Sequence, residues 1–459
     1  MFKKVFIANR GEIALRVIRS CKELGLLTVI GFSEADRESL PVKLADEKIC
    51  IGPAQPSESY LNIPSIIGAI EITKAEAVHP GYGFLSENIQ FVEICKASGI
   101  VFIGPTSKNI QLMGDKALAR KTAKSCRVPV IPGYEESVLK EALAHAKRIG
   151  FPVIIKASAG GGGRGMRRAN NAEEFVRYWT TCQEEAKASF GEGALYIEKF
   201  LEKPRHIEIQ VIGDKRGKVI VFPERDCSIQ RRHQKLIEES PSPFVNEKLR
   251  RHLYKYAYLL AKNIGYQSTG TIEFLVDSDS RPYFIEMNTR IQVEHPVTEI
   301  VSGIDLVKHQ ILVARGDRLG FAQKDITIKG HAIECRINAE DPSNNFMPSP
   351  GKITKLILPG GPGIRIDTHI YEGYEIPPYY DSLILKLIAY GINRAEAIER
   401  MQRVLEEIRI EGIKTTIPLY QKIFEHPTFL SGRYSTKWLE NFLSSESASE
   451  GSRTVHQKG

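Results

Sequence analysis

The sequence has 459 residues, of which 42% are hydrophobic and 26% charged, with 63 Lys and Arg against 55 Asp and Glu. A chain of this length forms about two to four domains, and its composition excludes an intrinsically disordered protein. The net charge is +8, but the basic residues are spread among acidic ones without a lysine-rich arm. We therefore expect a cleft for small anions and no nucleic-acid surface.

The cysteines and the apolar segments indicate a reducing compartment. Seven cysteines, an odd number, include no Cys-x-x-Cys pair, which argues against a disulfide framework or a cysteine-rich zinc site. The apolar run near Met1 is too short for a signal peptide, and no stretch of 18 apolar residues occurs. We expect a cytoplasmic protein without a membrane segment, ending in a flexible tail over 447–459.

The first part of the chain alternates strand and helix signals. The patterning predicts a helix over 12–24, ended by Gly25, and strands at 5–8, 27–32, 46–50, 77–79 and 100–104. Such βαβ alternation is typical of a parallel sheet with helices on both faces, so we expect an α/β protein with a Rossmann-like N-terminal domain over 1–113.

A second domain is expected over 114–330. It begins with a basic helix at 115–125, followed by breaks at Pro129, Pro132 and Gly133. Further strands are expected at 151–157 and 194–200, a hairpin from 206–214, and two more strands from Thr271. The third domain, over 331–446, is expected to be mixed α+β, rich in strands, with one last helix over 394–410.

The most informative segment runs from Phe284 to Pro296. Polar and apolar residues alternate along it, and the polar ones are Glu286, Asn288, Arg290, Gln292 and Glu294. In an extended chain alternate side chains share a face, so we expect these five groups to project from one face of a strand. A solvent-facing strand with ordinary salt bridges is the alternative, but Asp, Glu and Asn are poor strand residues.

A neighbouring strand, Thr271–Val276, adds another carboxylate. The turn after it, Asp277–Ser280, lets Glu273 lie beside Glu286 or Asn288. Two carboxylates and an amide oxygen suit Mg²⁺, and a divalent ion removes the repulsion between neighbouring carboxylates. We therefore expect a metal site at Glu273, Glu286 and Asn288.

A glycine-rich loop follows the strand at 151–157. Gly160, Gly162 and Gly165 satisfy GxGxxG, which would suggest an NAD-linked oxidoreductase. No helix starts within the glycines, however, and no GxxxxGK[ST] sequence occurs, so neither a dinucleotide fingerprint nor a P-loop is indicated. A mobile lid over phosphates, with Lys116 and Lys156 supplying positive charge, fits better than a flexible linker.

Residues 224–239 are rich in charged and hydrogen-bonding groups. The charge is too high for a core strand, so the segment is either an exposed loop or part of a binding site. His206 and His233 are ambiguous in the same way, as nucleotide contacts or as surface imidazoles.

The lid, the two lysines and the Glu/Glu/Asn set together resemble the ATP-grasp superfamily, and longer motifs resemble biotin carboxylase. The resemblance extends from residue 6 to about 440. It rests on Phe6–Ala14, His79–Asn88, Arg225–Lys235, Glu286–Glu299, Glu334–Pro342 and Pro378–Ser382. Ala159 and Pro223 stand where many members carry glycine, and neither replaces a catalytic group.

The resemblance implies a role for each matching position. ATP would contact Lys116, Lys156, Gly162, Gly163, Glu198, Lys199, Leu201, His206, Gln230, His233, Glu273 and Glu286. Bicarbonate would meet Lys235, Arg290, Gln292 and the backbone of Val293, with Glu294 as the base that deprotonates it. Arg336 would steady the biotin ureido oxygen, and Tyr82 and Gly83 would lie near the biotin pocket.

The implied activity is ATP-dependent carboxylation of biotin through carboxyphosphate, with Mg²⁺ or Mn²⁺, in a lid-closed site near 131–200. The sequence contains no Met-Lys-Met attachment site, so biotin is expected on a carrier protein or biotinylated subunit beside a carboxyltransferase component. Members are commonly homodimers. Alternatives are another ATP-grasp ligase activating a small carboxylate and a catalytically silent nucleotide sensor. The final carboxyl acceptor is not encoded in these motifs.

Overall fold

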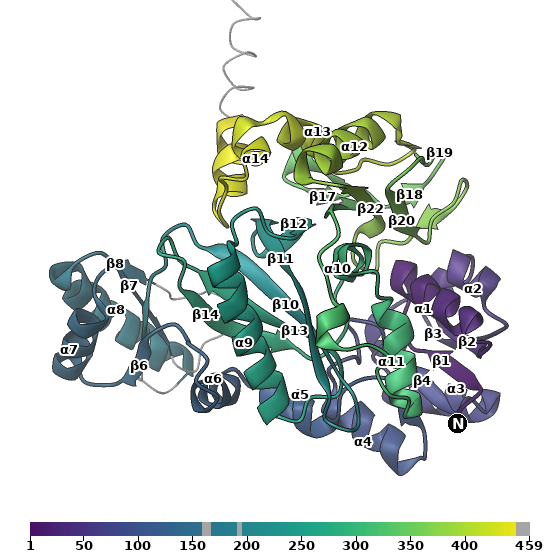
Figure 1. Cartoon of the computed structure of the whole chain (residues 1–459), viewed down its shortest axis with the longest axis horizontal. Helices are drawn as coiled ribbons and strands as arrows, with labels where there is room; N and C mark the ends of the chain where they lie inside the picture. Colours follow the sequence, from purple (N-terminus) through teal and green to yellow (C-terminus); the bar gives the residue numbers. More distant parts are fainter. Residues whose placement is uncertain (158–166, 191–194, 447–459) are drawn as a thin grey trace, which may run out of the picture. The chain divides into compact units, whose positions relative to one another are not determined.

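A computed structural model describes residues 1–157, 167–190 and 195–446, with the side chains of 157 and 185–190 left out. The chain forms two compact units (Figure 1). Unit 1 contains Met1–Val128, Arg205–Phe274 and the described residues from Glu286 onward, and unit 2 contains Pro129–Pro204 and Leu275–Ile285.

Unit 1 begins with a five-stranded parallel sheet, as the βαβ alternation predicts. Its order is β3 (Glu47–Gly52), β2 (Leu27–Ser33), β1 (Lys4–Ile7), β4 (Ala77–His79) and β5 (Val101–Phe102). The accompanying helices are α1 (Gly11–Glu23), α2 (Leu40–Leu44), α3 (Ile63–Thr73), α4 (Ile89–Ala97) and α5 (Ser107–Gly114).

The two faces of this sheet bury different clusters. Val5 and Ile7 of β1 pack in the cluster that contains Val17 of α1. Their neighbour Phe6 packs in the other cluster, with Ile66 of α3. This alternation along β1 is the period-two pattern of a strand covered on both sides.

The central sheet of the chain has eight strands. Its order is β14 (Pro282–Asn288), β13 (Ser268–Val276), β10 (Arg205–Gly213), β11 (Val219–Arg231), β12 (Gln234–Ser240), β15 (His331–Asn338), β22 (Leu383–Gly391) and β20 (Ile364–Thr368). Strand pairs from β10 to β20 are antiparallel. Helix α9 (Glu247–Asn263) lies along β10 and β11 (Figure 1). The remaining helices near this sheet are α6 (Lys116–Ser125), α10 (His295–Ser302) and α11 (Leu306–Arg315).

The segment 224–239 corrects the expectation that it is too charged for a core strand. It forms most of β11 and β12, and Glu224, Arg225 and Asp226 are almost completely buried. Opposite charges within the sheet compensate one another, for example Arg225 with Glu208 at 3.1 Å. Burying a charge costs free energy, and an opposite charge in contact with it offsets that cost.

The C-terminal part of unit 1 holds more helices than expected. Helix α12 (Arg394–Glu407) packs on β22 and β15, and the expected last helix thus ends three residues early, at Glu407. It is followed by α13 (Ile417–Glu425), α14 (Pro427–Leu430) and a helical stretch over 438–446. The prediction of a single last helix was wrong because prolines open the short helices: Pro418 and Pro427 stand in first turns, where a missing N–H costs nothing.

Several short elements complete unit 1. The two-stranded pairs are β16 (Glu340–Asp341) with β17 (Met347–Pro348), β18 (Gly351–Lys352) with β21 (Glu375–Ile376), and β19 (Lys355–Ile357) with β23 (Arg409–Glu411). The 3₁₀ turns are η1 (Glu34–Asp36), η2 (Pro56–Glu58), η3 (Gln323–Asp325) and η4 (Pro342–Asn344).

Unit 2 is a small α/β layer pair. Its antiparallel sheet has the order β6 (Gly133–Glu136), β9 (Leu195–Lys199), β7 (Val153–Ala157) and β8 (Arg167–Ala169). Helices α7 (Leu139–Ile149) and α8 (Ala172–Phe190) cover it, and Phe175 and Trp179 of α8 are buried against Val153 and Ile155 of β7. The strand expected at 151–157 and the one at 194–200 are both present.

Candidate active site

The segment from Glu286 to Glu294 departs from the predicted strand. Strand β14 ends at Asn288, and the chain then turns before α10 begins at His295. Pro296 stands in the first turn of α10, so the residues before it leave the extended conformation to enter the helix. The polar groups still converge, but by way of this turn and not along one face of a strand.

Glu273 of β13 is the point on which these groups converge. Its carboxylate accepts hydrogen bonds from Asn288 Nδ2 at 2.6 Å and from Gln292 Nε2 at 2.7 Å. It also lies 2.8 Å from His206 Nε2. Burial alone would raise the pKa of Glu273, but Lys235 and His206 hold it well below the ordinary value. Glu273 is therefore a buried, ionised carboxylate.

Lys235 of β12 stands among three carboxylates. Its ammonium contacts Glu208, Glu273 at 3.1 Å and Glu294 at 2.8 Å. Although burial lowers the pKa of Lys235, these carboxylates raise it well above the ordinary value. A permanently charged ammonium in this place suits the binding of an anion.

Glu294 is held between two cations. One oxygen accepts from Lys235, and the other accepts from Arg336 of β15 at 2.9 Å. Burial raises the pKa of Glu294, but Lys235 and Arg336 bring it below the ordinary value. Only 2% of the residue is exposed, so its carboxylate is charged and shielded from water.

Arg336 is oriented by a second carboxylate. Its Nε donates to Glu238 Oε1 of β12 at 2.6 Å, while its NH2 group reaches Glu294. A guanidinium fixed by two partners presents its remaining N–H groups in set directions. The structure thus brings the predicted Lys235, Glu294 and Arg336 together on adjacent strands and the turn before α10.

Arg290 lies in the turn after β14 and is partly exposed. Its Nε donates to Glu87 at 2.9 Å, and its NH2 group donates to Asn288 Oδ1 at 2.8 Å. Glu87 also accepts from the backbone and hydroxyl of Thr289, both at 2.9 Å. Glu87 thereby ties the Arg290 turn to the loop after β4.

The loop after β4 carries Tyr82 and Gly83. Asn9 Nδ2 donates to the carbonyls of Pro80, at 2.6 Å, and Tyr82, at 2.7 Å, and these hydrogen bonds hold the loop in place. The Tyr82 hydroxyl donates to Glu12 of α1. In doubly wound sheets ligands bind outside the carboxyl ends of the strands, which is where this loop lies.

Glu286 of β14 completes the predicted metal set. Burial and the charge of Glu273 raise the pKa of Glu286, which shows a repulsion between the two carboxylates that a divalent cation would relieve. Glu273, Glu286 and Asn288 supply only oxygen donors of the kind Mg²⁺ prefers. The residues present therefore fit a bound Mg²⁺.

Two other groups of ligand atoms lie close together: His206, Glu208 and Glu273, and Glu208, Cys227 and Glu294. In both groups Lys235 contacts the carboxylates. Because every carboxylate of these two groups contacts Lys235, they are poorer candidates for a metal than the set that includes Glu286.

Unit 2 carries the other predicted phosphate ligands. Lys156 Nζ lies 3.4 Å from Glu198 and 5.0 Å from the centre of the Tyr196 ring. Lys199 donates to the carbonyls of Gly150 and Phe151, so its ammonium is engaged with the backbone. Leu201 is buried. Gly162, Gly163 and the rest of the glycine loop lie outside the described residues.

The remaining nucleotide candidates differ in exposure. His206 and Gln230 are buried in unit 1, whereas Lys116 and His233 are exposed. His233 occupies the turn between β11 and β12 with a positive φ of 68°.

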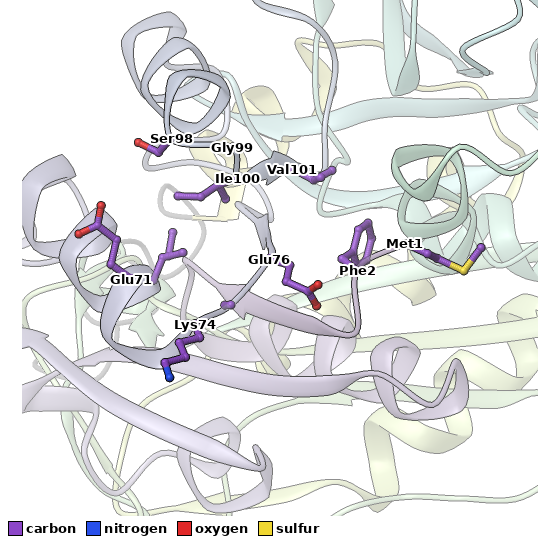
Figure 2. A pocket seen from close by; sticks show the side chains of 11 residues that line it. Met1, Phe2, Glu71, Lys74, Glu76, Ser98, Gly99, Ile100 and Val101 are labelled. Carbon is purple, nitrogen blue, oxygen red and sulfur yellow. The ribbon is translucent and has the colours of Figure 1, made fainter.

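A pocket of about 470 Å³ lies elsewhere, where Met1, Phe2 and Glu76 meet the loop at Ser98 (Figure 2). It is at the amino ends of β1 and β5, opposite to the edge at which such sheets bind ligands. Glu76 is engaged by the backbone N–H of Lys3 at 2.6 Å. This pocket contains none of the predicted catalytic groups.

Comparison with known proteins identifies the family of the chain. The biotin carboxylase N-terminal domain matches residues 1–110, the ATP-binding domain of the carbamoyl-phosphate synthase L chain matches 115–322, and the biotin carboxylase C-terminal domain matches 334–441. Biotin carboxylase from Nostoc sp. is 55% identical over 441 residues, which cover 96% of this chain and 99% of that protein. The chain belongs to the biotin carboxylase family.

Two further relatives come from different carboxylases. A pyruvate carboxylase subunit from Methanothermobacter thermautotrophicus is 52% identical over 96% of this chain and 90% of its own length. The biotin carboxylase domain dimer of the Hydrogenobacter thermophilus 2-oxoglutarate carboxylase, solved with MgADP, ADP and bicarbonate, has a TM-score of 0.86 and 50% identity, covering 96% of this chain and 98% of that one.

As a biotin carboxylase the protein is an ATP-dependent ligase that carboxylates biotin as a subunit of a biotin-dependent carboxylase. This confirms the predicted family, fold class and activity and excludes the NAD-linked oxidoreductase suggested by GxGxxG. In the part of the chain that the structure describes, no helix has both the length and the apolar character required to cross a bilayer.

Sequence reasoning missed several residues of this candidate site. The missed residues are buried, charged and in contact with predicted ones: Glu208, Arg225, Glu238, Lys386 and Glu12. Arg225 and Glu12 stand within motifs that carry the resemblance. Lys386 lies in an otherwise apolar strand, and a charged residue in such a position is a signal that could have been used.

Proposed function

We propose that bicarbonate binds among Lys235, Arg290, Gln292 and the backbone of Val293, and that Glu294 removes its proton. The observation that supports this best is the placement of Glu294, buried and ionised between Lys235 and Arg336. A carboxylate in this state accepts a proton when an acidic O–H is brought against it. The neighbouring cations then stabilise the dianion that forms.

The reaction proceeds from that proton transfer. A bicarbonate oxygen attacks the γ-phosphorus of ATP, the bond from this phosphorus to the β–γ bridging oxygen breaks, and ADP leaves. The resulting carboxyphosphate splits its C–O bond to give carbon dioxide and phosphate. The biotin ureido nitrogen then bonds to the carbon of carbon dioxide and loses its proton to phosphate. Arg336 faces the ureido oxygen, which gains negative charge, and Tyr82 and Gly83 line the biotin pocket.

The metal would be held by Glu273, Glu286 and Asn288, and Mn²⁺ would occupy the same oxygen ligands as Mg²⁺. When bound, the ion supplies positive charge to the phosphates of ATP. Of the protein's own groups, Lys116, Lys156 and His206 would add charge or hydrogen bonds to the nucleotide. The other proposed nucleotide contacts are Gly162, Gly163, Glu198, Lys199, Leu201, Gln230 and His233. Since the Lys199 ammonium is engaged with Gly150 and Phe151, this residue would use its backbone.

The proposed organisation keeps the domains expected from sequence: 1–113, 114–330 with a lid near 131–200, and 331–446. We propose that biotin arrives on a biotin carboxyl carrier protein or biotinylated subunit in the cytoplasm. A carboxyltransferase component would select the final acceptor. The chain would act as a homodimer, which the dimeric 2-oxoglutarate carboxylase domain supports.

The decisive experiment measures ADP release with Mg-ATP, with and without bicarbonate and free biotin. Stimulation by biotin that disappears without bicarbonate is the expected result. A rate of ADP release that does not change when biotin is added would contradict the proposal and indicate a ligase acting on another small carboxylate.

A further inference from the structure

Lys386 of β22 is a fully buried lysine behind the proposed bicarbonate site. Its ammonium donates to the Val293 carbonyl at 2.9 Å and pairs with Glu12 of α1 at 3.1 Å. Asp367 of β20 lies 3.9 Å away and is itself bound by Arg365 at 2.7 Å. In the sheet Lys386 is directly opposite Arg336 on one side and Asp367 on the other.

Glu12 connects this lysine to the biotin side of the site. One of its oxygens, Oε1, contacts Lys386 and also accepts the hydroxyl of Tyr82. Its other oxygen has no hydrogen-bond partner among the described residues, and 3% of the residue is exposed. Glu12 Oε1 therefore contacts both Lys386, which binds the Val293 carbonyl, and Tyr82, which lies at the proposed biotin pocket.

The Val293 carbonyl matters because Glu294 is the next residue in the chain. A peptide unit is planar, so fixing this carbonyl fixes the orientation of the N–H of Glu294 and the direction in which the chain enters that residue. Glu294 is the residue preceding α10 and carries the proposed base. Its side chain is held from the other direction by Lys235 and Arg336.

We propose that Lys386 and Glu12 are positioning residues. Together they hold the Val293–Glu294 peptide and the Tyr82 hydroxyl at fixed positions relative to each other. Lys386 sets the bicarbonate-binding turn, and Glu12 couples it to the biotin-binding tyrosine. This inference rests on the proposed function, because the roles of Val293, Glu294 and Tyr82 belong to that proposal. Neither Lys386 nor Glu12 touches a substrate in this assignment.

Removing only one of the charges would leave the other buried and unpaired, and the variant would lose stability for that reason alone. The test therefore uses the double variant Lys386→Met with Glu12→Gln. It removes both charges, and the glutamine oxygen still accepts the Tyr82 hydroxyl. Arg365 remains beside Asp367 to balance its charge.

The readouts are the KM values for bicarbonate, ATP and biotin, together with thermal unfolding. The double variant is expected to unfold cooperatively near the wild-type temperature. We expect its bicarbonate KM to rise about 10- to 100-fold, since a small displacement of a reacting group has effects of this size, with the ATP KM unchanged. Lys386→Arg, which keeps a buried cation, is expected to recover part of the loss.

A matched control removes another buried ion pair of unit 1, Arg250→Met with Glu224→Gln. This pair joins α9 to β11 at 2.7 Å and contacts no proposed substrate group. It is expected to leave the bicarbonate KM unchanged. Tyr82→Phe is expected to raise the biotin KM without raising that of bicarbonate.

Wild-type turnover with an unchanged bicarbonate KM in the folded double variant would overturn the inference and leave the proposed function intact. An equal rise in the control pair would also overturn it, by showing a general effect of stability. A wild-type protein without bicarbonate-dependent ADP release would reject the proposed function and this inference with it.

Discussion

Glu238 and Glu334 face each other directly across strands β12 and β15, and both are fully buried. Glu238 Oε1 accepts from Arg336, whereas its Oε2 and both oxygens of Glu334 have no hydrogen-bond partner among the described residues. Burial raises the pKa of Glu238 to about 7 against the pull of Arg336. Burial, opposed by Lys386 and reinforced by Glu238, raises the pKa of Glu334 well above its ordinary value.

We predict that this pair gives the enzyme a pH dependence near neutrality. The groups that face it are Arg336, Glu294, Lys235 and Lys386. As the pH rises through about 7, Glu238 loses its proton and holds Arg336 as a full carboxylate, so biotin-dependent turnover should rise. Stability should change in the opposite sense. Because the folded-state pKa is raised, the stabilisation is complete below the unfolded value of 4.5 and is lost as the pH rises toward 7.

Glu238→Gln should remove the rise in turnover near pH 7, so that biotin-dependent turnover stays low over the whole pH range. The profile is compared with that of the wild type at equal bicarbonate, since bicarbonate itself titrates. Glu334→Gln is the matched control, because Glu334 makes no hydrogen bond to Arg336 and its replacement should leave the rise near pH 7 in place. If the turnover of the Glu238→Gln enzyme still rose near pH 7, another group would control the pH dependence.

Glu294→Gln should abolish biotin carboxylation while ATP binding stays within about twofold of the wild type. The amide cannot accept a proton from bicarbonate, yet it fills the same volume between Lys235 and Arg336. Loss of a single essential base typically lowers turnover by about 100- to 10,000-fold. Turnover is measured as ADP release and binding by calorimetry, and weak nucleotide binding in this variant would remove Glu294 from the role of base.

How far the sequence predicted this site depends on the kind of residue. The Glu286–Glu294 segment was recognised by its alternating polar groups, and Asn288 and Gln292 do meet at Glu273. The reason was partly wrong, because the strand stops at Asn288 and the convergence depends on the turn before Pro296. A two-residue period identifies which residues are polar together, but not where an extended chain ends.

Contacts between distant segments could not be predicted from local pattern. Lys386 and Glu12 are separated by most of the chain, and only the pairing of β22 with β15 and the packing of α1 bring them together. The highly charged 224–239 segment misled for the same reason: its partners, such as Glu208, come from another strand. The fold class was predictable because the strand and helix signals near β1 are local in the sequence. The strands that they predict are present and pair in parallel in the structure.

Glu286→Gln should weaken the binding of the metal that accompanies the nucleotide. The wild-type carboxylate is destabilised by burial and by Glu273, and this repulsion favours a divalent cation at the site. Titration with Mg²⁺ at fixed ATP is expected to show a rise of about tenfold or more in the half-saturating metal concentration. Glu76→Gln, in the pocket at the opposite edge of the N-terminal sheet, serves as the control and should leave the titration unchanged. An identical curve for Glu286→Gln would exclude Glu286 as a ligand.

Arg225→Met should reduce the stability of the protein strongly. The guanidinium is fully buried and binds Glu208 at 3.1 Å, Gln210 at 2.9 Å, Thr298 at 3.0 Å and Thr271 at 3.1 Å. Methionine fills similar volume but leaves Glu208 without one of its cationic partners, and it removes the hydrogen bonds that Arg225 donates to the other three residues. We expect a loss of about 3–5 kcal/mol in the free energy of unfolding, measured by urea denaturation.

Lys355→Met is the control for that experiment. Lys355 pairs with Glu411 at 3.6 Å across β19 and β23, and both side chains are about half exposed. Exposed pairs of this kind contribute little, so a change of at most about 0.5–1 kcal/mol is expected. A loss in Arg225→Met no larger than in Lys355→Met would mean that water or local rearrangement replaces the guanidinium. The buried charges of β10 and β11 would then stabilise the sheet less than their contacts imply.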